Sequence, residues 1–426
     1  MEMLTRALLL VVLLVGSVGP IKAADVTVSK PETVGLSSAK LAEMKAHFQT
    51  YIDENKLAGI TTLIARRGKV VHFETYGDRD KEASSVMQKD TVFRIYSMTK
   101  PITGIAMMML WEEGKFKLDD PVSKYLPSFR NQKVFRGALD GGKLDTAPVE
   151  RDATIRDLMR HTAGLTYGYF GDTPVDRMYR NSDLYDQKND LKTLVKKLGR
   201  MPLLYQPGEA WVYSLSVDVQ GRLIEVLSGK SLDTFFNERI FTPLGMVDTG
   251  FQVRQDQVSR FSAVYGLNKE TGLTALKPGE GLLSDFKKKP TFLSGGGGLL
   301  STTADYWRFA QMVANGGTFD GVRYVKASTV EMMRKDQLPK KLGGIAGGKA
   351  GLGFGLDFAV VNDVAKNGGA TRKGEYFWGG YASTLFWIDP EEEVVAVLMT
   401  NFIPSRLYPL RNEMRQYVYD ALEDAE

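Results

Sequence analysis

The chain has 426 residues, of which 43% are hydrophobic and 25% are charged, a composition that suits a globular protein with one large domain or two packed domains. Its net charge is only +4 and its longest basic run is Lys287-Lys288-Lys289, so the charge pattern argues against a nucleic-acid partner. Because the chain has no cysteine, disulfides are excluded and stability must come from a packed core.

Residues 1–23 are expected to form a signal peptide. Arg6 precedes an apolar run from Ala7 to Val15, and Ala23 offers a small-residue cleavage site. The run is shorter than the ~20 apolar residues of a membrane span, which favours cleavage over an uncleaved anchor. The sequence therefore predicts a periplasmic or secreted protein, with no stable membrane insertion once the signal peptide is cleaved.

The first elements of the mature chain are a helix and a pair of strands. Residues 37–59 have a helical apolar pattern with Ser37 at the N-cap. Residues 61–77 predict two strands joined by a tight turn at Arg67-Gly68. Residues 101–111 are apolar on nearly every side, which is typical of a helix in the protein interior.

The remaining elements predict a helical middle and a second group of strands. Residues 295–317 indicate a glycine turn, a short strand and a capped helix, and residues 383–402 predict two paired strands. Strands at both ends with helices between them predict an α/β protein. We expect an antiparallel sheet flanked by helices, with a mostly helical inserted domain.

The expected domain boundaries follow from this pattern. The α/β domain should comprise residues 24–104 and 291–426, and the mostly helical domain should comprise residues 105–290. The active site is expected between these two domains.

The pattern Ser-x-x-Lys occurs three times, at residues 37–40, 97–100 and 284–287. Residues three apart on a helix share one face, so the Ser97 hydroxyl and the Lys100 amine can meet if a helix begins near Ser97, whereas Ser37 is explained by helix capping and Ser284 lies in a lysine-rich loop. A serine hydroxyl is a weak nucleophile that needs a base, and lysine can serve where a dry surround lowers its pKa. Only Ser97 and Lys100 precede an apolar helix, whose N-terminal N–H groups would also favour an oxyanion.

Other chemistries have little support in the sequence. The three histidines are scattered at positions 47, 72 and 161, and neither H-E-x-x-H nor G-x-S-x-G occurs. We interpret His47 and His72 as structural residues. Gly295–Gly298 lacks the Lys-Ser/Thr of a phosphate loop, so it is better explained as a turn into a strand. We therefore expect no metal and no cofactor.

The stretch "DTVFRIYSMTKPITGIAMMMLWEEGKFKLDDPVSKYLP" (90–127) resembles the segment around the active serine of the serine β-lactamase superfamily. Within it, the chain is similar to class C β-lactamase-like esterases, the family VIII carboxylesterases. The similarity continues in order through "LMRHTAGL" (158–165), "QPGEAWVYSLSVDVQGRLIE" (206–225), "FTPLGMVDTGF" (241–251), "GGGGLLSTTADYWRFAQM" (295–312) and "WGGYASTLFWIDP" (378–390). It implies a β-lactamase/penicillin-binding-protein-like fold.

The resemblance also implies roles for individual residues. Ser97 would be the nucleophile and Lys100 its activating partner. Tyr213, in "YSL", falls where the family places a catalytic tyrosine. Lys100 and Tyr213 would share the proton from Ser97, and Tyr213 would pass it to the leaving alkoxide. The N–H groups of Ser97 and Tyr381 would form the oxyanion hole.

Two departures from the class C pattern bear on the substrate. Leu215 stands where class C β-lactamases carry the Asn of Tyr-x-Asn, and Trp378-Gly379-Gly380 stands in place of Lys-Thr-Gly. An amide and a cation are thereby lost, while tryptophan offers an apolar wall and one N–H donor. Such a site should favour a neutral ester over an anionic lactam or a peptide terminus.

The favoured hypothesis is an exported carboxylesterase that cleaves short-chain carboxylic esters through an acyl-enzyme on Ser97. Its partner would be a small-molecule ester, bound near Trp378, Leu215 and the candidate pocket residues Tyr167 and Phe170. The alternatives are a class C-like β-lactamase or D-aminoacyl peptidase, and an acyltransferase on the same machinery. A non-catalytic β-lactam-binding sensor is the alternative from a different class.

Overall fold

A computed structural model describes residues 26–139, 143–277 and 285–423. The expected signal peptide, and Ser284 of the third Ser-x-x-Lys pattern, lie outside these residues. No helix in the described ranges is both long enough and apolar enough to cross a membrane.

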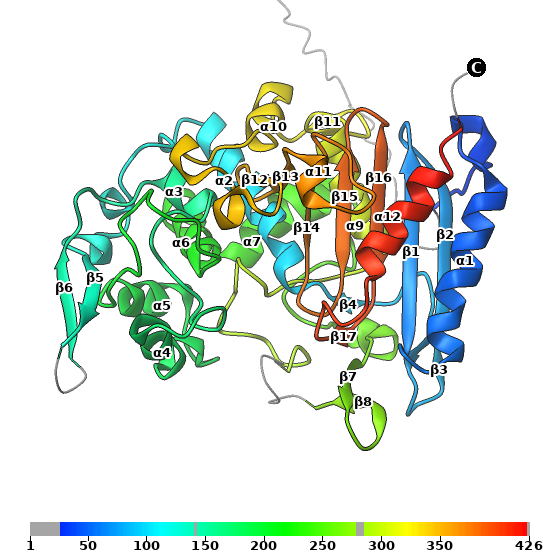
Figure 1. Cartoon of the computed structure of the whole chain (residues 1–426), viewed down its shortest axis with the longest axis horizontal. Coiled ribbons are helices and arrows are strands. Elements are labelled where there is room, and N and C mark those ends of the chain that lie inside the picture. Colours follow the sequence, from blue (N-terminus) through cyan, green and yellow to red (C-terminus); the bar gives the residue numbers. More distant parts are fainter. Residues whose placement is uncertain (1–25, 140–142, 278–284, 424–426) are drawn as a thin grey trace, which may run out of the picture.

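Eight strands form one antiparallel sheet in the order β12-β13-β14-β15-β16-β1-β2-β3 (Figure 1). The strands are β1 Gly59–Arg66, β2 Lys69–Asp80, β3 Ser85–Val86, β12 Leu352–Phe354, β13 Ala359–Val361, β14 Tyr376–Gly379, β15 Leu385–Asp389 and β16 Val394–Met399. The predicted pairings of β1 with β2 and of β15 with β16 are confirmed. Because β1 also pairs with β16, the two ends of the chain meet in the middle of the sheet.

Both faces of this sheet are buried under helices. Along β16, Val394, Ala396 and Leu398 face the core beneath α1 (Ser38–Asp53) and α12 (Leu410–Asp420). The alternate residues of β16 face the larger core, which holds α2 (Thr99–Glu112) and α9 (Thr303–Ala314). This alternation is the period of two that a strand imposes. Figure 1 shows α1 and α12 side by side over one face of the sheet.

The predicted apolar helix is α2, and every residue from Thr99 to Leu110 in it is buried. A helix without a polar face needs protein on all sides, and α2 has it because it lies between the sheet and the helical part of the chain (Figure 1). It follows a single 3-10 turn, η3 (Tyr96–Met98).

The middle of the chain is mostly helical but also carries two hairpins. Its helices are α3 Ile155–Met159, α4 Pro174–Arg180, α5 Leu191–Leu198, α6 Ser216–Ser228, α7 Leu232–Phe236 and α8 Thr242–Leu244. The hairpins are β5 Lys133–Ala138 with β6 Leu144–Pro148, and β7 Val264–Asn268 with β8 Gly272–Leu276. Smaller elements complete the fold: β4 Phe93–Arg94, β9 Leu300–Ser301, β10 Thr318–Phe319, β11 Val322–Arg323, β17 Phe402–Ile403, α10 Ala327–Met333 and α11 Val364–Asn367.

The second hairpin does not follow the expected boundary near residue 290. Strand β7 pairs in parallel with β17, and Tyr265 belongs to the core beneath α1 and α12. The hairpin therefore packs with the C-terminal part of the chain, because its apolar side chains find their partners there. The division into domains stays a prediction.

Candidate active site

Ser97 lies in the η3 turn, immediately before α2. Tyr96 has φ +42°, a left-handed backbone that an aromatic residue adopts only when the surroundings impose it. Two hydrogen bonds with the backbone of Leu299 hold the turn: the Ile95 N–H donates to Leu299 O, and the Leu299 N–H donates to the side-chain oxygen Thr99 Oγ1, both at 3.1 Å. The serine is thus held on a rigid turn at the head of a buried helix.

The structure brings Ser97 together with both of its predicted partners. Lys100 Nζ lies 3.1 Å from Ser97 Oγ, and the hydroxyl of Tyr213 lies 2.7 Å from the same oxygen. Tyr213 comes from the segment just before α6, more than a hundred residues away. Lys100 is only 1% exposed, so its amine works in a site largely closed to water.

Aromatic rings surround the Lys100 amine. Lys100 Nζ lies 4.6 Å from the ring centroid of Tyr213 and 5.3 Å from that of Tyr167, within the range of cation–π attraction. The Phe170 ring lies 5.4 Å from the Tyr213 ring although Phe170 is 69% exposed. Tyr167 and Phe170 therefore lie close to Lys100 and Tyr213, and their role in lining a substrate pocket stays a prediction.

Gly296 supplies a third partner for Lys100, which the sequence reasoning missed. The Lys100 amine donates to Gly296 O at 2.6 Å, and the Gly296 N–H donates to Asp218 Oδ1 at 3.2 Å. A Cβ at position 296 would lie 2.6 Å from Asp218 Oδ2, so only glycine fits. The glycine run is therefore more than a turn, because it carries the carbonyl that orients the lysine.

Asp218 is a buried carboxyl close to the lysine. Burial raises its pKa, while the hydrogen bond from Ser294 Oγ (2.5 Å), the charge of Lys100 and the Gly296 N–H oppose that rise. Asp218 thereby ties the glycine run to α6. Its position in "YSLSVD" was visible in the sequence, but nothing in the spacing indicated that it faces Gly296.

His161 lies on the other side of Tyr213. The two ring centroids are 5.1 Å apart, and His161 Nδ1 lies 3.1 Å from Ser214 Oγ. Burial holds the pKa of His161 well below its usual value, and the charge of Lys100 adds to the effect, so the ring is neutral. Its place in "LMRHTAGL" was the only sequence signal for this histidine.

Strand β14 ends beside the nucleophile. The indole N–H of Trp378 donates to the Tyr213 hydroxyl at 3.3 Å, so this donor is already engaged within the protein. A Cβ on Gly380 would lie 2.5 Å from Ile95 O. Glycine at this position allows the end of β14 to touch the chain two residues before Ser97.

Two N–H groups are available to an oxyanion at this junction. In the described part of the chain, neither the Ser97 N–H nor the Tyr381 N–H donates to a protein acceptor. The ring of Tyr381 packs edge-on against that of Tyr96, with centroids 5.7 Å apart. This arrangement fits the predicted oxyanion hole, and the roles of both amides stay predictions.

Leu215 departs from the expectation that it contacts substrate. It is 2% exposed, precedes α6 as its N-cap residue and belongs to the larger core. An apolar side chain at this position is buried by packing rather than held toward a substrate, so its effect on the site would come through that packing.

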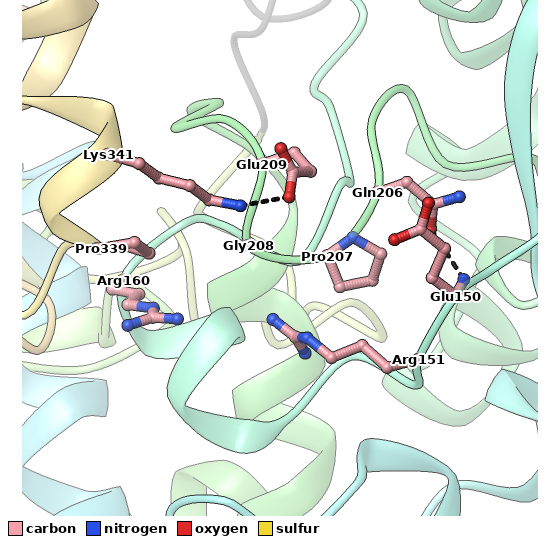
Figure 2. A pocket seen from close by; sticks show the side chains of 9 residues that line it. All are labelled: Glu150, Arg151, Arg160, Gln206, Pro207, Gly208, Glu209, Pro339 and Lys341. Atoms are coloured by element: carbon pink, nitrogen blue, oxygen red, sulfur yellow. Dashed lines mark hydrogen bonds and ion pairs between the residues drawn. The ribbon is translucent and has the colours of Figure 1, made fainter.

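The other candidate sites show less evidence of a catalytic or binding role. A surface cavity of about 350 Å³, shown in Figure 2, is lined by Glu150, Arg151, Arg160, Gln206, Pro207, Gly208, Glu209, Pro339 and Lys341. Its three cations are already paired, Arg151 and Arg160 with Asp157 and Lys341 with Glu209.

The described residues also contain no cluster of three acidic or histidine side chains that could hold a metal ion. Ser37 of the first Ser-x-x-Lys pattern caps α1 by accepting from the Lys40 N–H.

Comparison with known proteins places the chain in a family. The family model described as Beta-lactamase matches residues 44–416. Protein Rv1367c of Mycobacterium tuberculosis is 35% identical over 84% of this chain and 90% of its own length. Esterase EstB of Burkholderia gladioli is 29% identical over 91% of this chain and 98% of its own length.

A solved structure agrees with these sequence matches. The structure of "EstCE1, a hydrolase with promiscuous acyltransferase activity" is 26% identical, with a TM-score of 0.74 over 89% of this chain and 99% of that chain. The expected fold and the resemblance to esterases of this superfamily are thereby confirmed. The chain belongs to the β-lactamase family.

Proposed function

We propose that the protein is a serine hydrolase that cleaves short-chain carboxylic esters through an acyl-enzyme on Ser97. The observation that carries the proposal is the contact of Ser97 Oγ with both Lys100 Nζ and the Tyr213 hydroxyl, beside the apolar ring of Trp378. A nucleophile, a proton acceptor and a neutral binding wall are the parts that ester cleavage requires.

Acylation would begin when Ser97 Oγ forms a bond to the ester carbonyl carbon while its proton passes to the Tyr213–Lys100 pair. The carbonyl electrons move onto oxygen, where the N–H groups of Ser97 and Tyr381 would stabilise the oxyanion. Collapse of this intermediate breaks the bond to the alkoxide, which takes the proton from Tyr213. Water then attacks the acyl-serine by the reverse sequence and releases the acid.

The preference for a neutral ester rests on Trp378. Its ring stands where a β-lactamase carries the Lys of Lys-Thr-Gly, and its N–H is engaged by Tyr213. An anionic substrate would find no cation from this residue. The names of EstB and of the lovastatin esterase of Penicillium rubens, which is 30% identical over 49% of this chain, support an ester substrate.

Acyl transfer to an alcohol is a second candidate activity. An acyl-serine can react with any hydroxyl that reaches it, and the EstCE1 structure is titled a hydrolase with promiscuous acyltransferase activity. The test is the ratio of methyl butyrate to butyric acid formed from p-nitrophenyl butyrate in the presence of methanol. A ratio no greater than that of the uncatalysed reaction would contradict this second activity.

The ester hydrolysis itself is tested with purified chain starting at residue 24 and p-nitrophenyl butyrate. Ser97→Ala should lower kcat/KM by at least about 10³-fold, whereas Ser37→Ala, in the other described Ser-x-x-Lys pattern, should retain activity. Nitrocefin should be cleaved much more slowly than the ester. Unchanged hydrolysis by Ser97→Ala, or faster turnover of nitrocefin than of the ester, would contradict the proposal.

We also propose that the chain is exported with its signal peptide removed. The support is the sequence pattern of residues 1–23 alone. Expression of the full chain in a Gram-negative host, followed by fractionation and N-terminal mass measurement, tests it. A cytosolic product with the complete N-terminus would contradict it.

A further inference from the structure

Arg411, the second residue of α12, contacts the end of β14 from the face of the sheet that α1 and α12 cover. Its Nη2 donates to Gly380 O at 2.9 Å and to Thr384 O at 3.1 Å. A Cβ on Gly379 would lie 2.6 Å from the guanidinium carbon, so the glycine of Trp-Gly-Gly is what admits the arginine. One amino group thus joins the two sides of the turn that carries Tyr381.

The bonded carbonyl belongs to the peptide group whose N–H is the candidate oxyanion donor. Gly380 C=O and Tyr381 N–H are two ends of one planar, trans unit, so they point in opposite directions. A charge-assisted hydrogen bond on the oxygen withdraws electron density from the whole unit and makes its N–H a stronger donor. It also prevents the unit from rotating.

The surroundings of Arg411 do not suggest an ordinary ion pair. Its neighbour Arg415 pairs with Glu375 at 2.7 Å, whereas Arg411 forms no ion pair with any carboxylate of the described residues. Its Nε is buried without a hydrogen-bond partner there. Burial, together with the charges of Arg415 and Arg406, lowers the pKa of Arg411 to about 10, although Tyr213 opposes this shift. Burying a cation is costly, and within the described ranges the hydrogen-bond acceptors of the Arg411 guanidinium are the carbonyls of Gly380 and Thr384. Its charge therefore polarises those two carbonyl groups.

We propose that Arg411 is a positioning residue that orients and polarises the Gly380–Tyr381 peptide, so that the Tyr381 N–H stabilises the oxyanion. The inference rests on the proposed ester hydrolysis through Ser97. It adds to that chemistry a residue of α12 that acts through the backbone at the end of β14.

The test compares Arg411→Met and Arg411→Lys with the wild type on p-nitrophenyl butyrate. Arg411→Met should lower kcat/KM about 10- to 100-fold, somewhat less than the loss of an entire oxyanion donor. The affinity for 1-butaneboronic acid, which forms a tetrahedral adduct on the serine, should fall by a similar factor, while KM changes by less than about threefold. Arg411→Lys keeps a cation within reach of Gly380 O and should recover part of both losses.

Arg415→Met is the matched control, because it removes a buried arginine one helical turn away that bonds to neither Gly380 nor Thr384. It should lower Tm without the selective loss of boronate affinity. The inference is overturned if Arg411→Met retains wild-type kcat/KM and boronate affinity. It is also overturned if Arg415→Met, compared at an equal Tm, loses as much kcat/KM and boronate affinity as Arg411→Met. If Arg411→Met does not fold, Arg411→Lys decides the question. Wild-type kcat/KM and wild-type boronate affinity in that variant would then overturn the inference.

The two proposals fail in different ways. If the wild-type protein does not hydrolyse esters through Ser97, the proposed function fails before any arginine variant is made. If the wild type hydrolyses the ester and binds the boronate, but Arg411→Met does so equally well, the proposed function is supported and the role of Arg411 is contradicted.

Discussion

Tyr213 takes part in each proton transfer of the proposed mechanism. Its hydroxyl contacts Ser97 Oγ and the Trp378 indole N–H, while Lys100 Nζ lies over its ring. The tryptophan N–H donates to the phenol oxygen while the phenol donates to Ser97 Oγ, so Trp378 helps to hold the hydroxyl toward the serine. Trp378 therefore contributes to the chemistry of the tyrosine as well as to the apolar wall.

Replacement of Tyr213 by phenylalanine tests this role directly. Tyr213→Phe should lower kcat/KM for p-nitrophenyl butyrate by about 10²- to 10⁴-fold, because general acid–base catalysis is lost while the ring packing is kept. Tyr125→Phe is the control, since it removes a tyrosine hydroxyl that bonds only to surface groups near Asp120. Retention of more than half of the activity by Tyr213→Phe would show that another group moves the proton.

Individual residues of the site differed in how far the sequence could predict them. Ser97, Lys100 and Tyr213 lie in segments similar to a known family, so their meeting was predictable from that resemblance. Gly296, Asp218 and Arg411 act through contacts between segments far apart in the chain. Such contacts leave no local pattern, because a buried aspartate or an arginine in a terminal helix has the same sequence appearance as a surface one.

At the scale of elements, the end of β14 is the part most sensitive to change. Gly380→Ala would place a Cβ 2.1 Å from Thr384 Oγ1 and 2.5 Å from Ile95 O, so the turn must move away from Ser97. We expect kcat/KM to fall about 10²-fold or more, as when an oxyanion donor is lost. The measurement is ester hydrolysis by folded variants with matched circular dichroism spectra.

Gly137→Ala provides the control for this element. Gly137 lies in strand β5, and an added Cβ would meet nothing within 4 Å. This variant should keep wild-type kcat/KM. If Gly380→Ala does the same, the close approach of β14 to Ile95 is not needed for activity.

Elements with a strong local pattern were the ones that the sequence predicted well. The all-apolar run of α2 and the strand pairs β1–β2 and β15–β16 were predicted. The hairpin β7–β8 was missed, since its five-residue strands are only partly buried and owe their place to pairing with β17. Strands β12 and β13 have three residues each, and so few residues cannot show the alternation of apolar and polar side chains that identifies a strand.

For the molecule as a whole, buried histidine makes stability depend on pH. His72 lies in β2 with Nε2 2.8 Å from Thr62 Oγ1, and burial lowers its pKa to about 4. An unfolded histidine titrates near 6.5, so between these values the unfolded state binds more protons. The contribution of His72 is therefore present above pH 6.5 and is lost as the pH falls toward 4.

His72→Gln should reduce this loss. Between pH 7 and pH 4.5, the wild type should lose about 2 kcal/mol more unfolding free energy than the variant, as the linkage relation gives for these two pKa values. Urea unfolding at the two pH values provides the measurement. Burial raises the pKa of Asp305 to about 7, which acts in the opposite direction, so the comparison must be between variant and wild type. Parallel pH dependences would contradict the prediction.

The meeting of β1 with β16 in the middle of the sheet has a consequence for when activity first arises. Ser97 and Lys100 are made early, but Trp378 and Tyr381 belong to the last fifty residues of the chain. The first strands cannot complete the sheet until β16 has been synthesised and has paired with β1. Such long-range pairing is slow to form, and a nascent chain with its serine and lysine in place still lacks Tyr381, whose N–H is the second candidate oxyanion donor. Ester turnover during refolding should accordingly report the closure of the sheet, and appear only after the two ends of the chain have met.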